Sequence, residues 1–335
     1  MNNVIVLISI LVLSFILTYF VRKWAIKKSM IDHPNDRSSH SIPTPRGGGI
    51  AITLAWLIGL VYFRINNQIE INLFLALLSG LPLAIIGFLD DLLSLKPGIR
   101  FLIQFICAAL ALFFLSGLQV FDIGFWKFEF AWILTPIALI GIVWAINLFN
   151  FLDGIDGYIS AEVIFLGIVA FFLFHDIIAL LLVASVLGFL FWNWQKAKIF
   201  MGDVGSTLLG FNVAILAIYY QNTETSTLIF WIILTSVFWF DATMTLFRRI
   251  MNKENLSQAH RKHAFQRIVQ SGFSHQKTVL WAFTLNLVLF GLAYLSYVYP
   301  GYSIPLLLIS IVMLYVVLKR IDRKKAFDYS NIQEK

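Results

Sequence analysis

The chain has 335 residues, of which 59% are hydrophobic and 13% are charged, and its mean hydropathy is +0.83. A soluble domain carries roughly twice that charged fraction, so the composition excludes an ordinary soluble globular protein. The formal net charge is +7. This basic balance does not indicate nucleic acid, because the basic residues follow a membrane topology.

Long apolar segments follow one another along the chain. A bilayer core about 30 Å thick needs about 20 apolar helical residues to cross it, and backbone groups in lipid must be hydrogen-bonded internally. The apolar runs are continuous and do not alternate, which favours helices over a barrel. We therefore predict an all-α polytopic transmembrane bundle of about eleven spans, at residues 3–21, 47–63, 72–89, 101–117, 131–149, 159–174, 177–194, 207–220, 227–247, 278–299 and 303–318.

Two of these elements need comment. The first span has no basic residue before it and no small-residue cleavage site after it, so we expect it to be retained. In the segment 159–194, only His175 and Asp176 separate the two predicted spans. One helix of that length is too long for a single crossing, so we predict a tight helical hairpin there.

The basic residues orient the bundle. With the N-terminus outside, the loops 22–46, 90–100, 150–158, 195–206 and 248–277 and the tail from 319 are cytoplasmic and hold 23 of the 25 Lys and Arg. Only Arg64 and Lys127 fall on the other side, as the positive-inside rule requires. The sequence thus predicts a single membrane domain, 1–335, with a cytoplasmic tail at 319–335. Its expected partners are the lipid bilayer and an anionic substrate, and no nucleic acid.

Five carboxylates fall at the predicted cytoplasmic ends of spans, in three separate loops: Asp90, Asp91, Asp153, Asp156 and Asp203. Neighbouring carboxylates repel one another, so gathering them is unfavourable unless a cation sits among them. Oxygen ligands and a phosphate-bearing substrate suit Mg²⁺, with Mn²⁺ as an alternative. The sequence has no cysteine cluster and no HExxH motif, which argues against zinc. The simpler reading of Asp90 and Asp91 alone is a solvated pair beside the membrane.

Two glycine-containing segments surround these carboxylates. In NLFNFLDGIDG, Asn147, Asn150 and Asp153 are spaced three apart and share one helical face. In KAKIFMGDVGS, glycines flank Asp203 and leave backbone N–H groups free beside a carboxylate, which suits a metal–pyrophosphate. The simpler alternatives are a polar helix end and an ordinary capped turn.

Three further features are polar or basic. The segment QAHRKHAFQR places His260 and His263 near Arg261, which suits an anionic phosphate or an ordinary basic surface helix. The first cytoplasmic loop, which includes Arg46, ends in three glycines and is either functional or a plain connector. Asp241 lies inside an apolar span, where a charge suggests a role such as pairing with an arginine.

Together these segments closely resemble the polyprenyl-phosphate N-acetylhexosamine-1-phosphate transferase family (glycosyltransferase family 4). The resemblance covers about residues 32–267. It implies a Mg²⁺-dependent enzyme of the bacterial plasma (inner) membrane, with its active site facing the cytoplasm. Its expected reaction transfers a sugar 1-phosphate from a UDP-N-acetylhexosamine to undecaprenyl phosphate and releases UMP.

The resemblance also implies roles for particular residues. Asp90 would position or deprotonate the lipid phosphate, with Asp91 beside it. The remaining implied roles follow the matched motifs: Asn147, Asn150, Asp153 and Asp156 at the nucleotide site; Asp203, with Asn150, at the metal; Phe200 stacked on uracil; His260, Arg261 and His263 on pyrophosphate or sugar; and Arg46 on substrate.

The histidine segment places the chain within the family. Peptidoglycan-type members carry consecutive histidines there, whereas HRKHAFQR is similar to the branch that starts O-antigen synthesis from GlcNAc, FucNAc or QuiNAc donors. The first loop looks like that branch as well. The exact sugar, the choice between direct attack and a phospho-enzyme, and a homodimer stay open.

Two other functions are compatible with parts of this pattern. A secondary transporter of an anionic solute also uses charged helix ends and glycine breaks. A CDP-alcohol phosphatidyltransferase also clusters aspartates around a metal, but no Ala-Arg follows Asp153-Gly154 at the spacing it needs. A pure scaffold would leave the five carboxylates unexplained.

Overall fold

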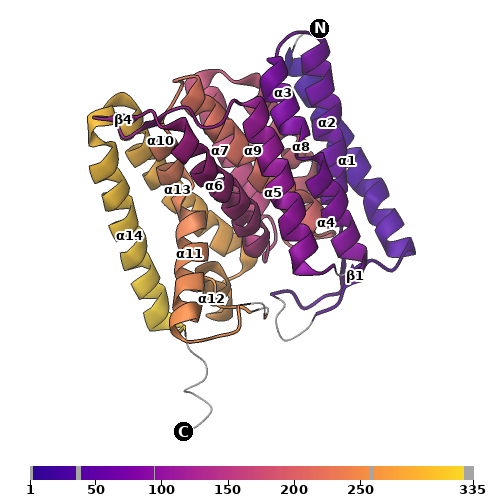
Figure 1. Ribbon diagram of the computed structural model, residues 1–335. Helices are drawn as coiled ribbons and strands as arrows, with labels where there is room; N and C mark the ends of the chain where they lie inside the picture. Colours follow the sequence, from indigo (N-terminus) through magenta and orange to yellow (C-terminus); the bar gives the residue numbers. More distant parts are fainter. Residues whose placement is uncertain (1–2, 35–38, 94, 257, 259, 328–335) are drawn as a thin grey trace.

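The computed structural model describes residues 3–34, 39–93, 95–256, 258 and 260–327 of the chain (Figure 1). This part is almost entirely helical, which confirms the predicted all-α class. The helices are α1 (Asn3–Lys27), α2 (Gly49–Ile65), α3 (Ile71–Leu78), α4 (Leu81–Leu93), α5 (Pro97–Phe114), α6 (Ala131–Leu152), α7 (Tyr158–Phe174), α8 (Ile177–Asn193), α9 (Asp203–Asn222), α10 (Leu228–Leu234), α11 (Ser236–Met251), α12 (Ala264–Gln270), α13 (His275–Val298), the 3-10 helix η1 (Pro300–Tyr302) and α14 (Ser303–Lys324). Two short antiparallel pairs complete it: β1 (Ile31–Asp32) with β2 (Thr44–Pro45), and β3 (Phe121–Asp122) with β4 (Lys127–Phe128).

Apolar helices long enough to cross a membrane dominate the described residues. Seven segments pass by length and composition, namely Asn3–Lys27, Ile71–Leu93, Pro97–Phe114, Ala131–Leu152, Asp203–Asn222, His275–Val298 and Pro300–Lys324. The pair α10–α11 adds an eighth candidate, and α2, α7 and α8 are shorter apolar helices. Each of the eleven predicted segments thus contains a helix or a broken helix. The number of spans that cross the bilayer, and their orientation, stay predictions.

Two predicted spans are not single straight helices. The third is interrupted by a turn at Ser79 and Gly80, between α3 and α4. The ninth bends by 74° at Thr235, between α10 and α11. The predicted hairpin at 159–194 is confirmed: α7 packs against α8, and His175 at the turn has φ +56°. Asp176 accepts a hydrogen bond from Ile178 N at 2.7 Å and so caps α8.

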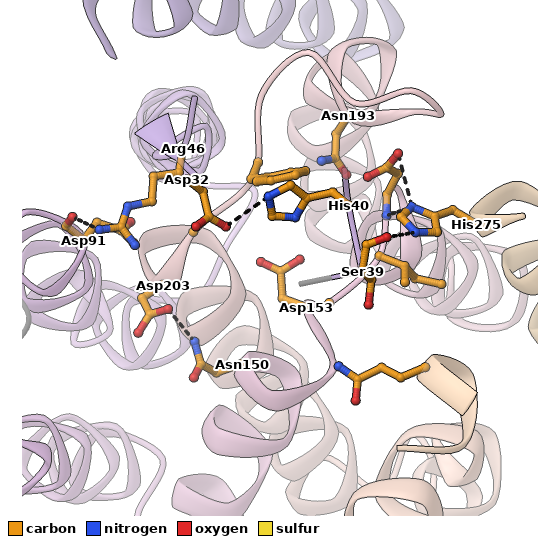
Figure 2. Close-up of a pocket in the computed structure, with 16 residues that line it drawn as sticks. Asp32, Ser39, His40, Arg46, Asp91, Asn150, Asp153, Asn193, Asp203 and His275 are labelled. Atoms are coloured by element: carbon orange, nitrogen blue, oxygen red, sulfur yellow. Dashed lines mark hydrogen bonds and ion pairs between the residues drawn. The ribbon is translucent and has the colours of Figure 1, made fainter. Parts of the chain in front are cut away.

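The two ends of the bundle differ. The N-terminal end of α1 and the β3–β4 hairpin lie at one end, and β1, α12 and the C-terminal end of α14 lie at the other (Figure 1). The second end also holds a pocket, drawn in Figure 2, where the last turn of α4, the C-terminus of α6 and the N-terminus of α9 meet. Residues from all five predicted cytoplasmic loops therefore gather at one end of the molecule.

Close backbone contacts join the first loop to the start of α9. Phe200 N donates to Pro45 O at 2.8 Å, and Gly49 N donates to Met201 O at 2.8 Å. A Cβ on Gly49 would lie 2.2 Å from the backbone N of Gly205, so only glycine allows this approach. Two segments about 150 residues apart in sequence are thus held together on one side of the pocket.

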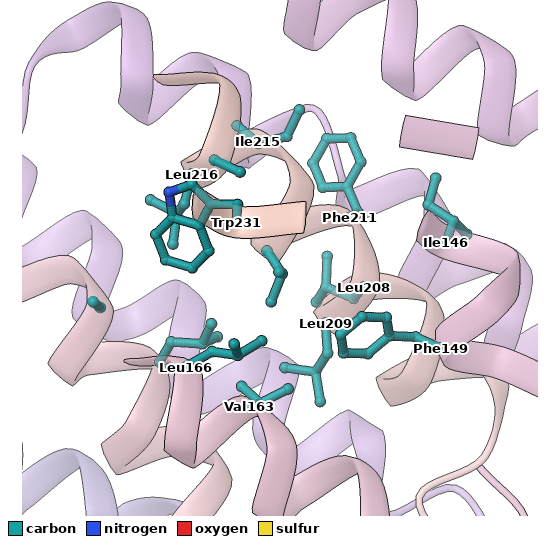
Figure 3. Close-up of a cluster of buried hydrophobic side chains, with 14 of the residues drawn as sticks. Ile146, Phe149, Val163, Leu166, Leu208, Leu209, Phe211, Ile215, Leu216 and Trp231 are labelled. Atoms are coloured by element: carbon teal, nitrogen blue, oxygen red, sulfur yellow. The ribbon is translucent and has the colours of Figure 1, made fainter. Parts of the chain in front are cut away.

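The apolar core surrounds α9, most of which is buried (Figure 3). Phe211, Leu209 and Ile215 of α9 are fully buried and pack with Phe149 of α6 and Trp231 of α10 in one apolar cluster. Lipid tails are as apolar as these side chains, so close packing holds the helices together more than burial from water does. This core fixes α9, and with it the position of Asp203 at the helix N-terminus.

Candidate active site

One polar cavity, with a volume of about 390 Å³, lies among the helix ends (Figure 2). Its walls come from the first loop, α4, α6, the loop before α9, α12 and α13. The lining residues are Asp32, Ser39, His40, Arg46, Asp91, Asn150, Asp153, Gly154, Ile155, Asp156, Asn193, Phe200, Gly202, Asp203, Gln266 and His275. The structure therefore brings together four of the five carboxylates predicted for the site, along with Asn150, Phe200 and Arg46.

Asp203 is the first residue of α9 and is held on two sides. Asn150 Nδ2 donates to Asp203 Oδ1 at 2.8 Å. Arg100 Nη1 lies 3.1 Å from Asp203 Oδ2 and 2.6 Å from Asp90 Oδ2. The N-terminus of a helix favours negative charge, which adds to this stabilisation. Asp203 is therefore fixed at the point where a phosphate or a cation would meet the helix end.

Asp91 is the most enclosed carboxylate of this end of the cavity. Its side chain is buried, and its Oδ2 atom has no hydrogen-bond partner among the described residues. Arg46 donates to the backbone carbonyl of Asp91, and Arg46 Nη1 lies 3.9 Å from Asp91 Oδ1. A Cβ on Gly202 would lie 2.4 Å from Asp91 Oδ2, so the glycine is required here. A buried carboxylate oxygen without a protein partner is open to a water, a proton or a cation.

Asp153 follows the last turn of α6 and is half-buried in the cavity wall. Burial raises the pKa of its carboxyl to about 8, with further contributions from the negative charges of Asp203, Asp91 and Asp156. Such a group binds a proton at neutral pH unless a cation arrives. The charge of Asp153 therefore depends on what the cavity holds.

Asp156 lies at the other end of the cavity, next to His275. Asp156 Oδ2 is 3.3 Å from His275 Nδ1 and accepts a hydrogen bond from Ala197 N at 3.1 Å. His275 Nε2 lies 3.0 Å from the carbonyl of Ser39. These contacts join the loop after α6, the loop before α9, the start of α13 and the first loop.

Aromatic rings line a third part of the cavity. The rings of His40 and Phe200 meet edge to face, with centroids 4.8 Å apart. His40 Nε2 lies 3.8 Å from Asp32 Oδ2. An aromatic face can bind a planar heterocycle, and Phe200 lines the cavity, so base stacking on Phe200 stays a prediction.

Five residues predicted for the site lie outside the cavity lining: Asp90, Asn147, His260, Arg261 and His263. Asn147 is buried and donates to Gln104 Oε1 of α5 at 2.7 Å, so its amide joins two helices. Asp90 accepts hydrogen bonds from Arg100 and from Leu95 N, the latter at 2.7 Å. Asp90 therefore reaches the site through Arg100, and it is Asp91 that lines the cavity.

The histidine motif is largely tied into the protein. His263 is buried with its Nδ1 atom 3.6 Å from Asp241 Oδ1. Asp241 also accepts a hydrogen bond from Ala264 N at 2.8 Å, so it caps α12. The expectation that Asp241 pairs with an arginine is wrong: its partners are His263, the first N–H groups of α12 and Thr245.

His260 and Arg261 line a different cavity, of about 670 Å³. Burial lowers the pKa of His260 to about 3, helped by nearby His263 and Arg249, so its imidazole is neutral at physiological pH. A neutral imidazole can donate a hydrogen bond to phosphate but adds no charge. Of the predicted motif HRKHAFQR, Gln266 is the residue that lines the main cavity.

The C-terminal end of α14 anchors the same region. Asp322 accepts two hydrogen bonds of 2.9 Å from Arg248 and one of 2.7 Å from Arg267. Arg267 is almost fully buried and also donates to Lys325 O at 2.9 Å. These arginines hold α11, α12 and α14 together.

Sequence reasoning missed Arg100, His275 and Gln266. In the sequence, Arg100 served only to orient the bundle, although the predicted loop 90–100 also holds Asp90 and Asp91. His275 follows His263 by twelve residues and belongs to no recognised pattern. Their roles depend on contacts between distant segments, for which the sequence gives no local signal.

The side chains of the cavity fit the ligands that Mg²⁺ takes. Within the described residues, no group of three or more His, Cys, Asp or Glu side chains lies close enough to hold a metal ion. Mg²⁺ needs fewer, because it takes one or two carboxylates together with waters and substrate phosphates. The unpartnered oxygen of Asp91, with Asp203 and the amide of Asn150 on the same side of the cavity, fits that demand.

Fold and site together define an integral membrane protein of many helices, with a carboxylate-rich polar cavity at one end of the bundle. Sequence comparisons extend this description. The model of glycosyl transferase family 4 matches residues 73–221, inside the region where the motifs lie.

Relatives match most of the chain. The "Probable undecaprenyl-phosphate N-acetylglucosaminyl 1-phosphate transferase" of Bacillus subtilis (strain 168) is 31% identical over 284 residues, which cover 82% of this chain and 79% of the relative. The "Undecaprenyl-phosphate alpha-N-acetylglucosaminyl 1-phosphate transferase" of Escherichia coli (strain K12) is 30% identical, covering 81% and 77%. The Thermotoga maritima protein of the same name is 27% identical, covering 84% and 88%. The chain belongs to the polyprenyl-phosphate N-acetylhexosamine-1-phosphate transferase family, glycosyl transferase family 4.

Proposed function

We propose that this protein transfers an N-acetylhexosamine 1-phosphate from a UDP-sugar to undecaprenyl phosphate and releases UMP. The main support is the convergence of Asp91, Asp153, Asp156 and Asp203 in one cavity at the end of an apolar bundle. A lipid phosphate can reach such a cavity from the membrane surface, and a water-soluble nucleotide can reach it from the adjoining solvent. The relatives' names support an N-acetylglucosaminyl 1-phosphate transfer, so UDP-GlcNAc is the first donor to test.

In this reaction an oxygen of the lipid phosphate forms a bond to the sugar-bearing phosphorus. The bond from that phosphorus to the bridging oxygen breaks, and UMP leaves with the bridging oxygen and its electron pair. Both reactants are anionic, so the site must reduce their repulsion. Arg46 and Arg100 supply fixed positive charge at the end that holds Asp91 and Asp203.

Mg²⁺, with Mn²⁺ as an alternative, is part of this proposal. Asp203, Asn150 and Asp91 would hold the ion. Bound there, it would neutralise charge on the donor diphosphate. Asp153, with its raised pKa, would accept a proton in the metal-free site and release it when positive charge enters. Phe200 would stack on the base, and Asp156 would contact the nucleotide.

The proposal also covers the cellular setting. We infer a bacterial inner membrane protein whose cavity faces the cytoplasm, because 23 of 25 basic residues fall in the loops assigned to that side. The HRKHAFQR spacing supports a role in starting O-antigen or a related surface polysaccharide, with GlcNAc, FucNAc or QuiNAc as the sugar.

The test is a donor screen with purified protein in detergent. Undecaprenyl phosphate and Mg²⁺ are mixed with UDP-GlcNAc, UDP-FucNAc, UDP-QuiNAc or UDP-glucose. UMP is quantified, and the lipid product is identified by mass spectrometry. We expect UMP and a lipid diphosphate sugar with one of the three N-acetylated donors, and neither product in EDTA. Uptake of an anionic solute by liposomes, without UMP release from any donor, would favour a transporter.

A further inference from the structure

His275 is the first residue of α13 and lies at the end of the cavity opposite Asp91, with Asp153 between them (Figure 2). Its side chain is 12% exposed, so it is largely enclosed but still reaches the cavity. Neither the mechanism above nor any motif in the sequence assigns it a role. Its surroundings nevertheless restrict what its imidazole can do.

The contact with Ser39 fixes one ring nitrogen. His275 Nε2 lies 3.0 Å from the carbonyl oxygen of Ser39, and a carbonyl oxygen can only accept. Nε2 must therefore carry a proton in this arrangement. The other nitrogen, Nδ1, is left to interact with Asp156.

Asp156 can bind Nδ1 of His275 whether that nitrogen is protonated or not. Nδ1 lies 3.3 Å from the backbone N of Asp156 and 3.3 Å from its Oδ2 atom. A neutral imidazole accepts from the N–H, and an imidazolium donates to the carboxylate. His275 therefore holds Asp156 whether or not it is charged.

One oxygen of Asp156 is left for a ligand. Oδ2 is used by His275 and by Ala197 N, which donates to it at 3.1 Å. Oδ1 accepts no hydrogen bond from any residue in the part of the chain that the structure describes, and Asp156 lines the cavity. The His40–Phe200 ring pair lines the same cavity. A fixed carboxylate oxygen and an aromatic ring pair in one cavity suit a planar base with an N–H group, such as uracil.

We propose that His275 is a positioning residue for the donor nucleotide: it fixes the Asp156 carboxylate so that Oδ1 accepts a hydrogen bond from the uracil ring. This inference rests on the proposed function, because it requires a uridine nucleotide as ligand. Through Ser39, His275 also ties the first loop to this nucleotide end of the cavity.

The experiment uses three substitutions that retain different parts of the imidazole. His275→Asn keeps a polar group near the Nδ1 position, facing Asp156. His275→Gln keeps a polar group near the Nε2 position, facing Ser39, and His275→Ala keeps neither. Lys277→Ala, two residues further along α13, is the matched control because Lys277 is exposed and does not line the cavity.

Two quantities are measured in each purified variant. The first is the Kd of UMP alone, by equilibrium binding without lipid acceptor; the second is the KM for each substrate. We expect His275→Ala and His275→Gln to raise the UMP Kd and the UDP-sugar KM about tenfold, the effect of losing a hydrogen bond to a charged group. We expect His275→Asn to stay within about threefold of wild type, and the undecaprenyl phosphate KM to change in no variant.

A double-mutant cycle separates positioning from general damage. If His275 acts through Asp156, combining His275→Ala with Asp156→Asn adds little to the effect of Asp156→Asn alone on UMP binding. The cycle reports on folded protein, selected by size-exclusion chromatography, and His275→Asn remains available if His275→Ala does not fold.

Several results would overturn the inference. Unchanged UMP affinity in all three variants would do so, as would fully additive effects in the cycle. If His275→Gln retained wild-type UMP affinity and His275→Asn lost it, the contact with Ser39 would be the important one, and the role through Asp156 would be wrong. If wild-type protein neither binds UMP nor releases it, the proposed function itself is wrong, and this inference falls with it.

Discussion

Arg100 on α5 reaches α9, where its Nη1 atom lies 3.1 Å from Asp203 Oδ2, and the same atom lies 2.6 Å from Asp90 Oδ2. One guanidinium thus stands between two carboxylates from segments about 110 residues apart. Its positive charge offsets the repulsion between the carboxylates of Asp90 and Asp203. A divalent cation bound by Asp203 would therefore compete with Arg100 for the same oxygen.

This competition predicts opposite effects of Arg100→Ala on metal binding and on turnover. Without the guanidinium, Asp203 is a freer ligand, so we expect Mn²⁺ affinity to rise roughly fivefold, the scale of a partly exposed ion pair. We expect turnover to fall, because fixed positive charge beside the reacting phosphates is lost. Mn²⁺ binding is measured by electron paramagnetic resonance, and Arg64→Ala, at the far end of α2, is the control. Weaker Mn²⁺ binding in Arg100→Ala would contradict the competition.

Asp203→Asn tests the charge of this carboxylate without changing its shape. Asparagine keeps an oxygen that can accept from Asn150, and the start of α9 stays packed on the core. We expect turnover to fall by about 100-fold to 1,000-fold, while the thermal midpoint stays near that of wild type. UMP release and thermal unfolding are measured in parallel. Near-normal activity would refute a ligand role for Asp203, and Asp122→Asn, in the β3–β4 hairpin, controls for loss of a half-buried carboxylate elsewhere.

Helix positions followed from the sequence because each depends on local composition. The hairpin between α7 and α8 was predictable because His175 and Asp176 separate two apolar spans within the 36 residues 159–194. The bend of 74° between α10 and α11 was not predictable, because Thr235 and Ser236 lie in an otherwise apolar run with no proline or glycine. Packing against other helices, which no local pattern records, decides such a bend.

The site residues that lie within sequence motifs could be predicted, but their partners from distant segments could not. Asp91, Asp153, Asp156 and Asp203 could be grouped because each ends or begins an apolar span. Asn147 shares their helical face by spacing, but its amide is taken by Gln104 of α5, and no spacing rule reveals that partner. The same limit applies to every contact between distant loops.

The raised pKa of Asp153 predicts that the stability of the metal-free protein depends on pH. Its pKa in the folded protein is about 8, whereas the usual value for an aspartate is near 4. The folded state therefore binds more protons than the unfolded state between these values, so its stability falls as pH rises from about 4 to about 8. Below this range the contribution is fully present, and above it the contribution is lost.

Thermal unfolding in EDTA at pH 6 and pH 9 tests whether stability falls as the pH rises. Wild-type protein should lose more stability between the two values than Asp153→Asn, which cannot ionise. Mn²⁺ affinity should rise with pH up to about 8, because a cation displaces the proton from this group. An identical pH profile for wild type and Asp153→Asn would exclude Asp153 as the titrating carboxylate.

The last prediction concerns His263, which the sequence suggested as a direct ligand of the donor. In the structure its ring lies 3.6 Å from Asp241, and both are buried. His263→Ala would leave Asp241 with Thr245 and backbone N–H groups, so we expect a loss of stability of about 1–3 kcal/mol. The capped helix α12 carries Gln266 into the cavity, so a loosened α12 should also raise the KM for UDP-sugar more than that for the lipid.

Thermal unfolding and both KM values are compared with those of His33→Ala, an exposed histidine of the first loop. Gln266→Ala is the informative partner, because it removes the side chain in the cavity but leaves the contact between His263 and Asp241 intact. If α12 transmits the effect, both variants raise the UDP-sugar KM, but only His263→Ala lowers the thermal midpoint. A normal midpoint in His263→Ala, with the KM for UDP-sugar raised alone, would instead place His263 in direct contact with the donor. Equal effects on both substrates would remove the donor-side role altogether.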